Sequence, residues 1–142
     1  MADTFHVQVL KPDGLVLEAE AVDAVIPGVL GYFGVRKGHA PLLTMLGVGE
    51  VTIKGPAGEQ HVAVIADGFC EVGPERVVVL AETAERSDEV DVARAERAKA
   101  RAEEIIRNPT ASAEELEKAH GALERAETRI KVAQAGREAR RH

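Results

Sequence analysis

Hydrophobic and polar positions alternate with a period of two in the first part of the chain. Phe5, Val7 and Val9 are separated by His6 and Gln8, which is the pattern of a β-strand with one buried face. Further short segments rich in β-branched residues, which are typical of strands, are Leu15–Leu17, Ala21–Ile26, Val51–Ile53, Val62–Ile65 and Val77–Leu80. Glycine and proline, which favour turns, separate these segments at Pro12–Gly14, Pro27–Gly28, Gly47–Gly49, Gly55–Gly58 and Gly73–Pro74. Many short strands at this spacing predict an antiparallel β-sandwich or barrel of about 85 residues.

The last part of the chain has the longer period of a helix pair. One apolar stripe, in which large and small residues alternate, consists of Leu116, Ala119, Leu123, Ala126, Ile130 and Ala133. A thinner stripe at helical spacing consists of Ala95, Ala98, Ala102 and Ile105. Asn108-Pro109 is expected to interrupt the helix between the stripes, and Ser112 with Glu115 has the spacing of a capping box.

We therefore predict helices at about residues 88–107 and 112–138, joined as an antiparallel hairpin, with Ser87 and Ser112 near their starts as N-caps. Because an alanine methyl gains little free energy on burial, we expect this hairpin to be held together weakly and to be able to open.

A change of composition near Glu85 separates the two parts. Eleven of the 13 glycines and five of the six prolines lie in residues 1–84. The prediction is an α+β fold with two domains: an antiparallel β-sandwich or barrel in residues 1–86 and a two-helix hairpin in residues 87–142.

Composition argues against several classes of function. The 24 acidic and 18 basic residues give a net charge of −6, which does not suit a general nucleic-acid binder. The single cysteine, Cys70, precludes an internal disulfide and a cysteine-cluster metal site, and the five histidines lack metal-ligand spacing. The chain has neither a long apolar run for a membrane span nor the pattern of a signal peptide, so we expect a soluble protein of a reducing compartment.

Catalytic motifs are also missing from the sequence. It contains no G-x-S-x-G motif and no Walker loop, and the run Gly28–Gly34 has the wrong spacing for a phosphate loop. We predict no catalytic residue, no metal site and no required cofactor.

The segment Gly31–Met45 has the composition of a docking loop. Tyr32 and Phe33 stand beside Arg36, Lys37 and His39 in a glycine-rich connection, and exposed apolar residues in such a segment often mark an interface. The alternative is an ordinary loop in which His39 makes only local hydrogen bonds.

Within this segment, Gly38–Thr44 (GHAPLLT) resembles the signature of the ε subunit family of bacterial and chloroplast F-type ATP synthases, whose mitochondrial counterpart is called δ. Val9–Gly14, Ala66–Val72 and Val77–Arg86 are also similar to family motifs, and Val90-Asp91-x-x-Arg94-Ala95 matches the family's helix-entry motif. The resemblance covers almost the whole chain and includes both predicted domains.

The resemblance implies a non-catalytic subunit of the central stalk. The sandwich would bind the γ subunit and sit on the ring of c subunits, so that all three turn together. The hairpin would lie folded or extend to the catalytic alpha and beta subunits, where it would inhibit ATP hydrolysis. The complex alone would hold the chain at the cytoplasmic face of a bacterial membrane. The implied γ and c-ring residues are Gly31, Tyr32, Phe33, Arg36, Gly38, His39, Pro41 and Leu42.

This sequence departs from the family within the docking segment. The family commonly has Gly-Glu-Leu-Gly and a proline before GHAP, whereas Tyr32, Phe33 and Lys37 stand here. The expected ring contact is therefore apolar or aromatic and does not depend on an acidic residue.

The helical spacing also places arginines beside the apolar stripes. Arg94 and Arg101 flank one stripe, Arg125 and Arg129 flank the other, and an antiparallel hairpin would bring them to one face without acidic partners for the first three. Guanidinium groups suit phosphate oxygens, and the resemblance implies a regulatory ATP site, with or without Mg²⁺. The implied residues are Glu85, Val90, Asp91, Arg94, Ala95, Arg101, Arg125 and Arg129. The alternative is a solvated basic edge, with Asp91 and Arg129 as an ordinary ion pair.

The basic stretch Gly136–Arg141 admits two interpretations. It could meet acidic surfaces of the catalytic subunits, or it could only compensate the dipole of the second helix. For the whole chain, the alternative function is a free-standing ligand-binding β-sandwich with a helical oligomerisation hairpin.

Overall fold

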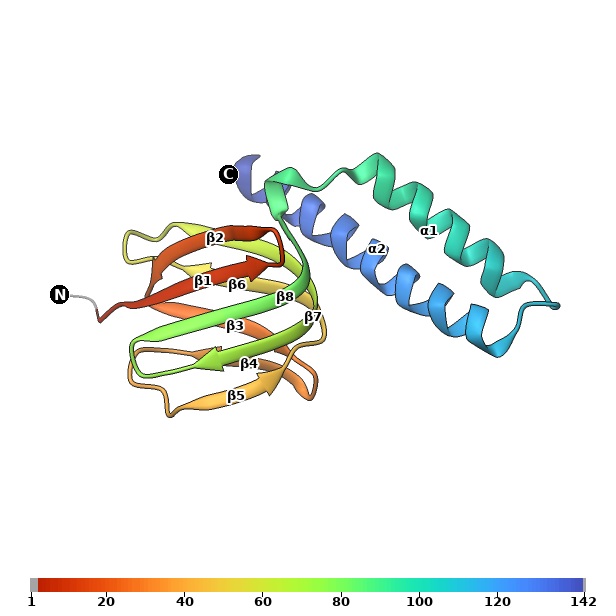
Figure 1. The fold of residues 1–142 in the computed structure, drawn as a ribbon. Coiled ribbons are helices and arrows are strands. Elements are labelled where there is room, and N and C mark those ends of the chain that lie inside the picture. Colours follow the sequence, from red (N-terminus) through yellow and green to blue (C-terminus); the bar gives the residue numbers. More distant parts are fainter. Residues whose placement is uncertain (1–2, 142) are drawn as a thin grey trace. The chain divides into compact units, whose positions relative to one another are not determined.

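The computed structural model describes the backbone of residues 3–141 and the side chains of residues 3–135. The chain divides into two compact units, Met1–Ser87 and Asp88–His142. The first contains the strands and the second contains both long helices (Figure 1).

The first unit is a β-sandwich made from one folded sheet of eight strands. These strands are β1 (Phe5–Lys11), β2 (Gly14–Ala21), β3 (Asp23–Gly28), β4 (Gly31–Val35), β5 (Leu42–Met45), β6 (Val48–Lys54), β7 (Gln60–Val72) and β8 (Arg76–Arg86). Their order in the sheet is β2-β1-β8-β7-β6-β3-β4, and β5 also pairs with β7. The predicted sandwich is confirmed, with one difference: β1 and β8 are parallel, whereas the other pairs are antiparallel.

The core lies between the layers of this sheet. Phe5, Val7 and Val9 are at most 2% exposed, which confirms the predicted inward face of β1. Buried Val, Ile and Ala side chains from the other strands complete a continuous cluster. Alternation along each strand therefore fixes which side chains face outward.

A corner in the sheet joins β5 to β6. β5 and β6 pair with successive parts of β7 in the same register, and Leu46 and Gly47 between them are not paired in this ladder. Opposite this interruption, Asp67 has φ +59° and Gly68 has φ +119°. The Leu46 N–H donates to the Gly68 carbonyl at 2.9 Å, so both paired segments bend at the same place.

Three predicted features of this unit are wrong. The segment Gly31–Met45 is not a loop, because strands β4 and β5 occupy both of its ends. Gly49 lies within β6 and not in a turn. A Cβ at this position would overlap the Tyr32 hydroxyl and lie 2.7 Å from the Pro27 Cβ. Close packing, and not chain reversal, requires glycine at this position. The predicted turn at Pro27–Gly28 likewise falls inside β3.

The second unit is a helical hairpin of α1 (Val92–Arg107) and α2 (Ala113–Arg141), preceded by the short 3₁₀ helix η1 (Ser87–Glu89). The predicted start of the first helix near residue 88 is four residues too early, because Asp91 is the N-cap and its carboxylate accepts from the Arg94 N–H at 3.0 Å. The predicted capping box of α2 is confirmed. The Glu115 N–H donates to Ser112 Oγ at 3.1 Å, and the Ser112 N–H donates to Glu115 Oε1 at 3.2 Å.

Alanines form most of the contact between the two helices. Ala95, Ala102, Ala119 and Ala126 are at most 3% exposed, as the seven-residue spacing predicts. Ile105 differs from the prediction, because it is 40% exposed near the turn of the hairpin. The close packing of small side chains gains little hydrophobic free energy per contact.

Candidate functional site

The outer face of the β-sandwich carries an exposed apolar row across five adjacent strands. Cross-strand pairing joins Met45 to Phe69, Phe69 to Leu80, Leu80 to Leu10, and Leu10 to Leu15. The strands are β5, β7, β8, β1 and β2, which lie side by side in Figure 1. We call the outer face of these five strands the docking face and these five residues the apolar row.

The apolar row is unusually exposed for large side chains. Met45 is 56% exposed, and Phe69, Leu80 and Leu15 are each 50% or 51% exposed, while Leu10 is half-buried. Directly opposed residues in a sheet lie about 5 Å apart, so these side chains form one continuous strip and not scattered exposures. A continuous exposed apolar strip of this kind is typical of an interaction surface.

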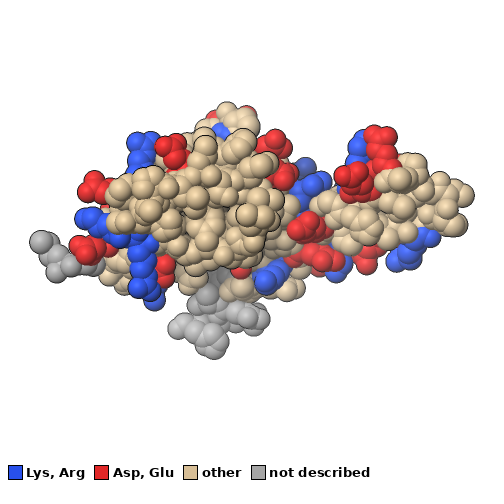
Figure 2. Space-filling view, turned by 90° about the horizontal axis from the view of Figure 1, so that it is seen from below, with Lys and Arg blue, Asp and Glu red and all other residues tan. Residues whose placement is uncertain are grey.

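One side of the sandwich carries few charged side chains. Figure 2 shows one side of the molecule on which uncharged side chains cover most of the sandwich, with Lys, Arg, Asp and Glu gathered toward its margins. The exposed residues Leu42, Leu43 and Met45 of β5 add to the apolar surface of this unit. Its surface is therefore suited to contact with another protein.

Sequence reasoning missed the apolar row, although a signal was present. The run Val77–Leu80 contains no polar residue, so both faces of that strand are apolar. Val77 and Val79 are fully buried, and Leu80 on the other face is exposed. A strand that is apolar on both faces is typically buried on both faces, so its outer face is expected to contact another element or another protein. This expectation could have identified the docking face.

The predicted docking aromatics have different environments from those expected. Tyr32 is 56% exposed, but its hydroxyl accepts from the Glu50 N–H at 3.1 Å and its ring covers Gly49. Phe33 packs against the buried core, so the expectation of an exposed Phe33 is wrong. The alternation along β4 turns these two neighbours to opposite faces.

The apolar tip of the neighbouring hairpin was not among the predicted contacts. Val29 is 57% exposed and Leu30 is 98% exposed between β3 and β4, directly before Gly31. This tip and the exposed part of Tyr32 form an apolar and aromatic surface at one end of the sandwich.

The remaining predicted docking residues connect β4 to β5. Arg36 and Lys37 are exposed, and the Gly38 N–H donates to the Pro74 carbonyl at 2.7 Å, which holds this turn against the one before β8. His39 Nδ1 lies 2.6 Å from the Ala40 carbonyl oxygen, as the local alternative expected. Pro41 is exposed, and Leu42 is 39% exposed at the start of β5, beside the docking face.

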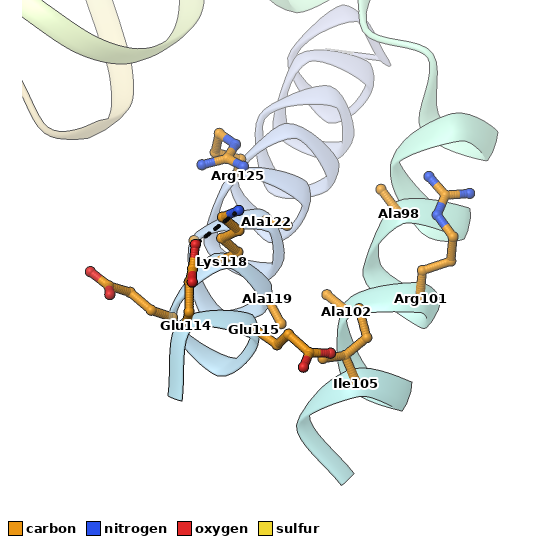
Figure 3. A pocket seen from close by; sticks show the side chains of 12 residues that line it. Ala98, Arg101, Ala102, Ile105, Glu114, Glu115, Lys118, Ala119, Ala122 and Arg125 are labelled. Carbon is orange, nitrogen blue, oxygen red and sulfur yellow. Dashed lines mark ion pairs between the residues drawn. The ribbon is translucent and has the colours of Figure 1, made fainter. Parts of the chain in front are cut away.

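In the hairpin, a groove of about 880 Å³ runs between the two helices near their turn. We call it the hairpin groove. It is lined by Ala98, Arg101, Ala102, Ile105, Glu114, Glu115, Glu117, Lys118, Ala119, Gly121, Ala122 and Arg125 (Figure 3). Small side chains form its floor, and charged side chains from both helices surround it. Lys118 pairs with Glu114 at 3.5 Å.

The structure brings only two of the predicted nucleotide-binding arginines to this groove. Arg101 projects from α1 and Arg125 from α2, where Arg125 passes close to Gly121 (Figure 3). Three acidic side chains share the lining, so the prediction of an acid-free face is wrong. The first turn of α2 carries Glu114 and Glu115, and the helical repeat continues this side through Lys118 to Arg125.

The other predicted nucleotide-binding residues lie outside the groove lining. Arg94 is exposed on the first turn of α1, and Asp91 already accepts a hydrogen bond from its N–H. Ala95 is 3% exposed within the helix contact. Val90, Arg129 and Glu85 are half-buried, with Glu85 at the end of β8 in the first unit. The side chains of Gly136–Arg141 lie outside the described residues.

The described residues also bear on three other features: a metal site, a membrane-spanning helix and a reactive thiol. Among these residues no group of His, Cys, Asp and Glu is arranged to hold a metal ion, and no helix is long and apolar enough to cross a membrane. Cys70 is fully buried, and burial raises the pKa of its thiol to about 12. A thiol in this environment is a poor nucleophile.

Comparisons with known families match both units. The family described as ATP synthase, Delta/Epsilon chain, beta-sandwich domain matches residues 4–87, and the one described as ATP synthase, Delta/Epsilon chain, long alpha-helix domain matches residues 88–134. The ATP synthase epsilon chain of Moorella thermoacetica is 39% identical over 130 residues, or 92% of this chain and 96% of the relative. That of Koribacter versatilis is 48% identical over 106 residues, or 75% of this chain and 74% of the relative.

Solved structures show the same fold. A chain of the mitochondrial ATP synthase of Euglena gracilis matches with a TM-score of 0.78 at 21% identity, covering 99% of this chain and 82% of that one. A chain of the central stalk and c-ring structure from Tetrahymena thermophila matches with a TM-score of 0.57 at 11% identity, covering 91% and 96%. With two domain families matched in order over residues 4–134 and curated relatives aligned over most of its length, the chain belongs to the ATP synthase delta/epsilon chain family.

Proposed function

We propose that the chain is a non-catalytic subunit of the central stalk of an F-type ATP synthase, and that its docking face binds the γ subunit. The observation that carries this proposal is the apolar row, because a strip of half-exposed large side chains on a folded sandwich requires a protein cover. Membership in the family supports an ATP synthase as the complex that would provide this cover, and it favours this function over a free-standing ligand-binding module.

In this arrangement the docking face couples rotation of the c-ring to γ. The exposed Val29 and Leu30, together with Tyr32, would meet the ring through apolar contacts. The complex would hold the chain as a peripheral protein at the cytoplasmic face of the bacterial membrane.

Co-purification with γ tests this function most simply. Recombinant γ subunit and this chain, mixed and passed over a sizing column, should elute as one stoichiometric complex. Separate elution at micromolar concentrations would contradict the stalk function and favour the free-standing module.

For the hairpin, we propose that it inhibits ATP hydrolysis by leaving its folded form and contacting the alpha and beta catalytic subunits. The alanine-rich contact between α1 and α2 supports this, because it lowers the free energy needed to separate the helices. Removal of all residues after Asn108 should raise ATP hydrolysis by the reconstituted complex while rotation stays coupled. Unchanged hydrolysis in this truncated complex would contradict the inhibitory role.

As a regulatory ligand of the hairpin, we propose ATP, with or without Mg²⁺, in the hairpin groove. Arg101 and Arg125 reach the groove from different helices, so an anion bound by both would favour the folded hairpin. The groove is lined by three basic and three acidic side chains, so an incoming phosphate gains little net attraction. We therefore expect weak binding, with Glu115→Gln tightening it and the exposed Glu104→Gln leaving it unchanged.

Calorimetric titration with ATP separates this site from the one predicted by sequence alone. Arg101→Ala and Arg125→Ala should each weaken binding, whereas the exposed Arg107→Ala should not. A loss in Arg94→Ala without a loss in Arg101→Ala would place the nucleotide nearer the start of α1. The absence of binding by the wild-type chain at millimolar ATP would exclude the regulatory site.

A further inference from the structure

The docking face continues beyond the apolar row into a charged row. His6, Gln8 and Leu10 all point outward from β1, so His6 lies two positions along the same face from Gln8. In the pairing with β2, His6 lies opposite Glu20, and in the pairing with β8 it lies opposite Arg76. The order of the charged row is therefore Glu20, His6 and Arg76, with Glu18 next to Glu20 on the same face of β2.

Both ring nitrogens of His6 face carboxylates. His6 Nδ1 lies 2.7 Å from Glu20 Oε1, and Nε2 lies 2.5 Å from Glu18 Oε1. Gln8 Nε2 also donates to Glu18 Oε1 at 3.3 Å, and the His6 backbone N–H donates to the Glu75 carbonyl at 2.9 Å. The imidazole is thus fixed between two acids on the edge strand, with its backbone anchored at the turn before β8.

This geometry selects one protonation state. A neutral imidazole has a single N–H, so one of its nitrogens would direct a lone pair at a carboxylate oxygen. The imidazolium donates from both nitrogens and satisfies both partners. In agreement, the hydrogen bonds to Glu20 and then Glu18 raise the pKa of His6 above its ordinary value of 6.5.

We propose that His6, Glu18 and Glu20 form a proton-controlled charge cluster at the rim of the docking face, and that its protonated form binds the γ subunit more tightly. This inference rests on the docking function proposed above. With His6 protonated, the charges of His6, Arg76, Glu18 and Glu20 cancel (1 + 1 − 2 = 0). With His6 neutral, the same four groups carry −1 (0 + 1 − 2), and covering them next to an apolar strip costs more desolvation free energy.

The direction of the pH effect follows from the raised pKa of His6. A raised value means that the folded chain favours the imidazolium, so the stabilisation is fully present below pH 6.5 and is lost as pH rises through the higher folded-state value. The two contacts of the imidazolium with Glu18 and Glu20 and the neutral rim are both lost as pH rises. Binding to γ should therefore weaken as the medium becomes alkaline.

The test measures the Kd between the full chain and recombinant γ from pH 6 to pH 9. We expect wild-type binding to weaken about two- to fivefold over this range, the size typical of an exposed charge pair. His6→Gln should remove the part of the pH dependence that comes from this cluster, so its Kd should change less with pH than that of wild type. The matched variant His120→Gln, altered at an exposed position of α2, should keep the wild-type slope. Thermal unfolding of each variant verifies that the sandwich is intact.

A second measurement keeps the inference testable without γ. The ring signals of His6, followed by NMR in the full chain, should titrate above pH 6.5, and the midpoint should fall in Glu20→Gln. Equal pH slopes in wild type and His6→Gln would overturn the charge cluster and leave the docking function standing. Failure of wild type to bind γ at any pH would overturn both, and a His6 midpoint at or below 6.5 would overturn the cluster alone.

Discussion

Gly68 is the position at which a single methyl group should disturb the sandwich most. It lies at the corner of β7 with φ +119°, directly before Phe69 of the apolar row. A Cβ at this position would overlap the Leu80 carbonyl oxygen and lie 2.9 Å from the Ala81 Cα. Both obstacles are backbone atoms of β8, so the neighbouring strand itself has to move.

The expected cost of Gly68→Ala has two parts. The positive φ costs an L-residue about 1–2 kcal/mol, and displacement of β8 weakens at least one ladder hydrogen bond for about 1–2 kcal/mol more. A loss of about 2–4 kcal/mol would lower the Tm of a sandwich of this size by about 10–25 °C. Denaturant unfolding and a thermal scan of the full chain, followed by β-sheet circular dichroism, measure both quantities.

Two matched glycines separate strain from overlap. Gly58→Ala adds a methyl group in open space at φ +87°, so it should cost only the strain. Gly34→Ala has no positive φ, and its nearest neighbour is the Ala24 carbonyl oxygen at 4.0 Å, so it should be nearly neutral. A cost for Gly68→Ala no greater than that for Gly58→Ala would refute the account of the corner.

Three further expectations concern single side chains. Ser112→Ala removes the capping hydrogen bond to the Glu115 N–H and should lower hairpin stability by about 1 kcal/mol, measured by helical circular dichroism on heating; an unchanged melting curve would argue against the cap. Ala126→Leu forces a larger side chain into a fully buried helix contact and should cost about 1–3 kcal/mol in the same assay, whereas the exposed Ala135→Leu should not. Cys70, with a pKa of about 12, should resist a disulfide reagent at pH 8 in the native chain and react fully in denaturant; rapid native reaction would show that the thiol is accessible.

The elements with strong local signals could be predicted from the sequence. Alternation of Phe5, Val7 and Val9 identified the buried face of β1, and the spacing of Ser112 and Glu115 identified the start of α2. These signals act within a few residues of the chain. Non-local pairing left no comparable mark, so neither the parallel alignment of β1 with β8 nor the continuous register of β5 and β6 along β7 could be foreseen.

The prediction of the candidate sites was limited in the same way, because local sequence signals were visible and contacts between distant residues were not. Glycine and proline suggested a loop at Gly31–Met45, but its first residues pair with β3 as strand β4. The packing of Tyr32 against Gly49, far along the chain, left no mark in the local sequence. Likewise, the helical spacing predicted Arg101 and Arg125 on one face, and both line the hairpin groove, but it overlooked Glu115, whose side chain reaches the groove from the start of α2. The apolar row emerges only when five strands are aligned, because each strand contributes a single residue to it.

Binding of γ to a chain with an altered apolar row tests the central claim most directly. Phe69 and Leu80 are 51% and 50% exposed, and covering the exposed half of each should contribute about 1 kcal/mol. The double variant Phe69→Ser/Leu80→Ser should therefore raise the Kd for recombinant γ about 30-fold. The control is Ile105→Ser, which removes a 40% exposed apolar side chain from the hairpin and should leave the Kd unchanged. A folded double variant that binds γ within twofold of wild type would contradict the assignment of the docking face.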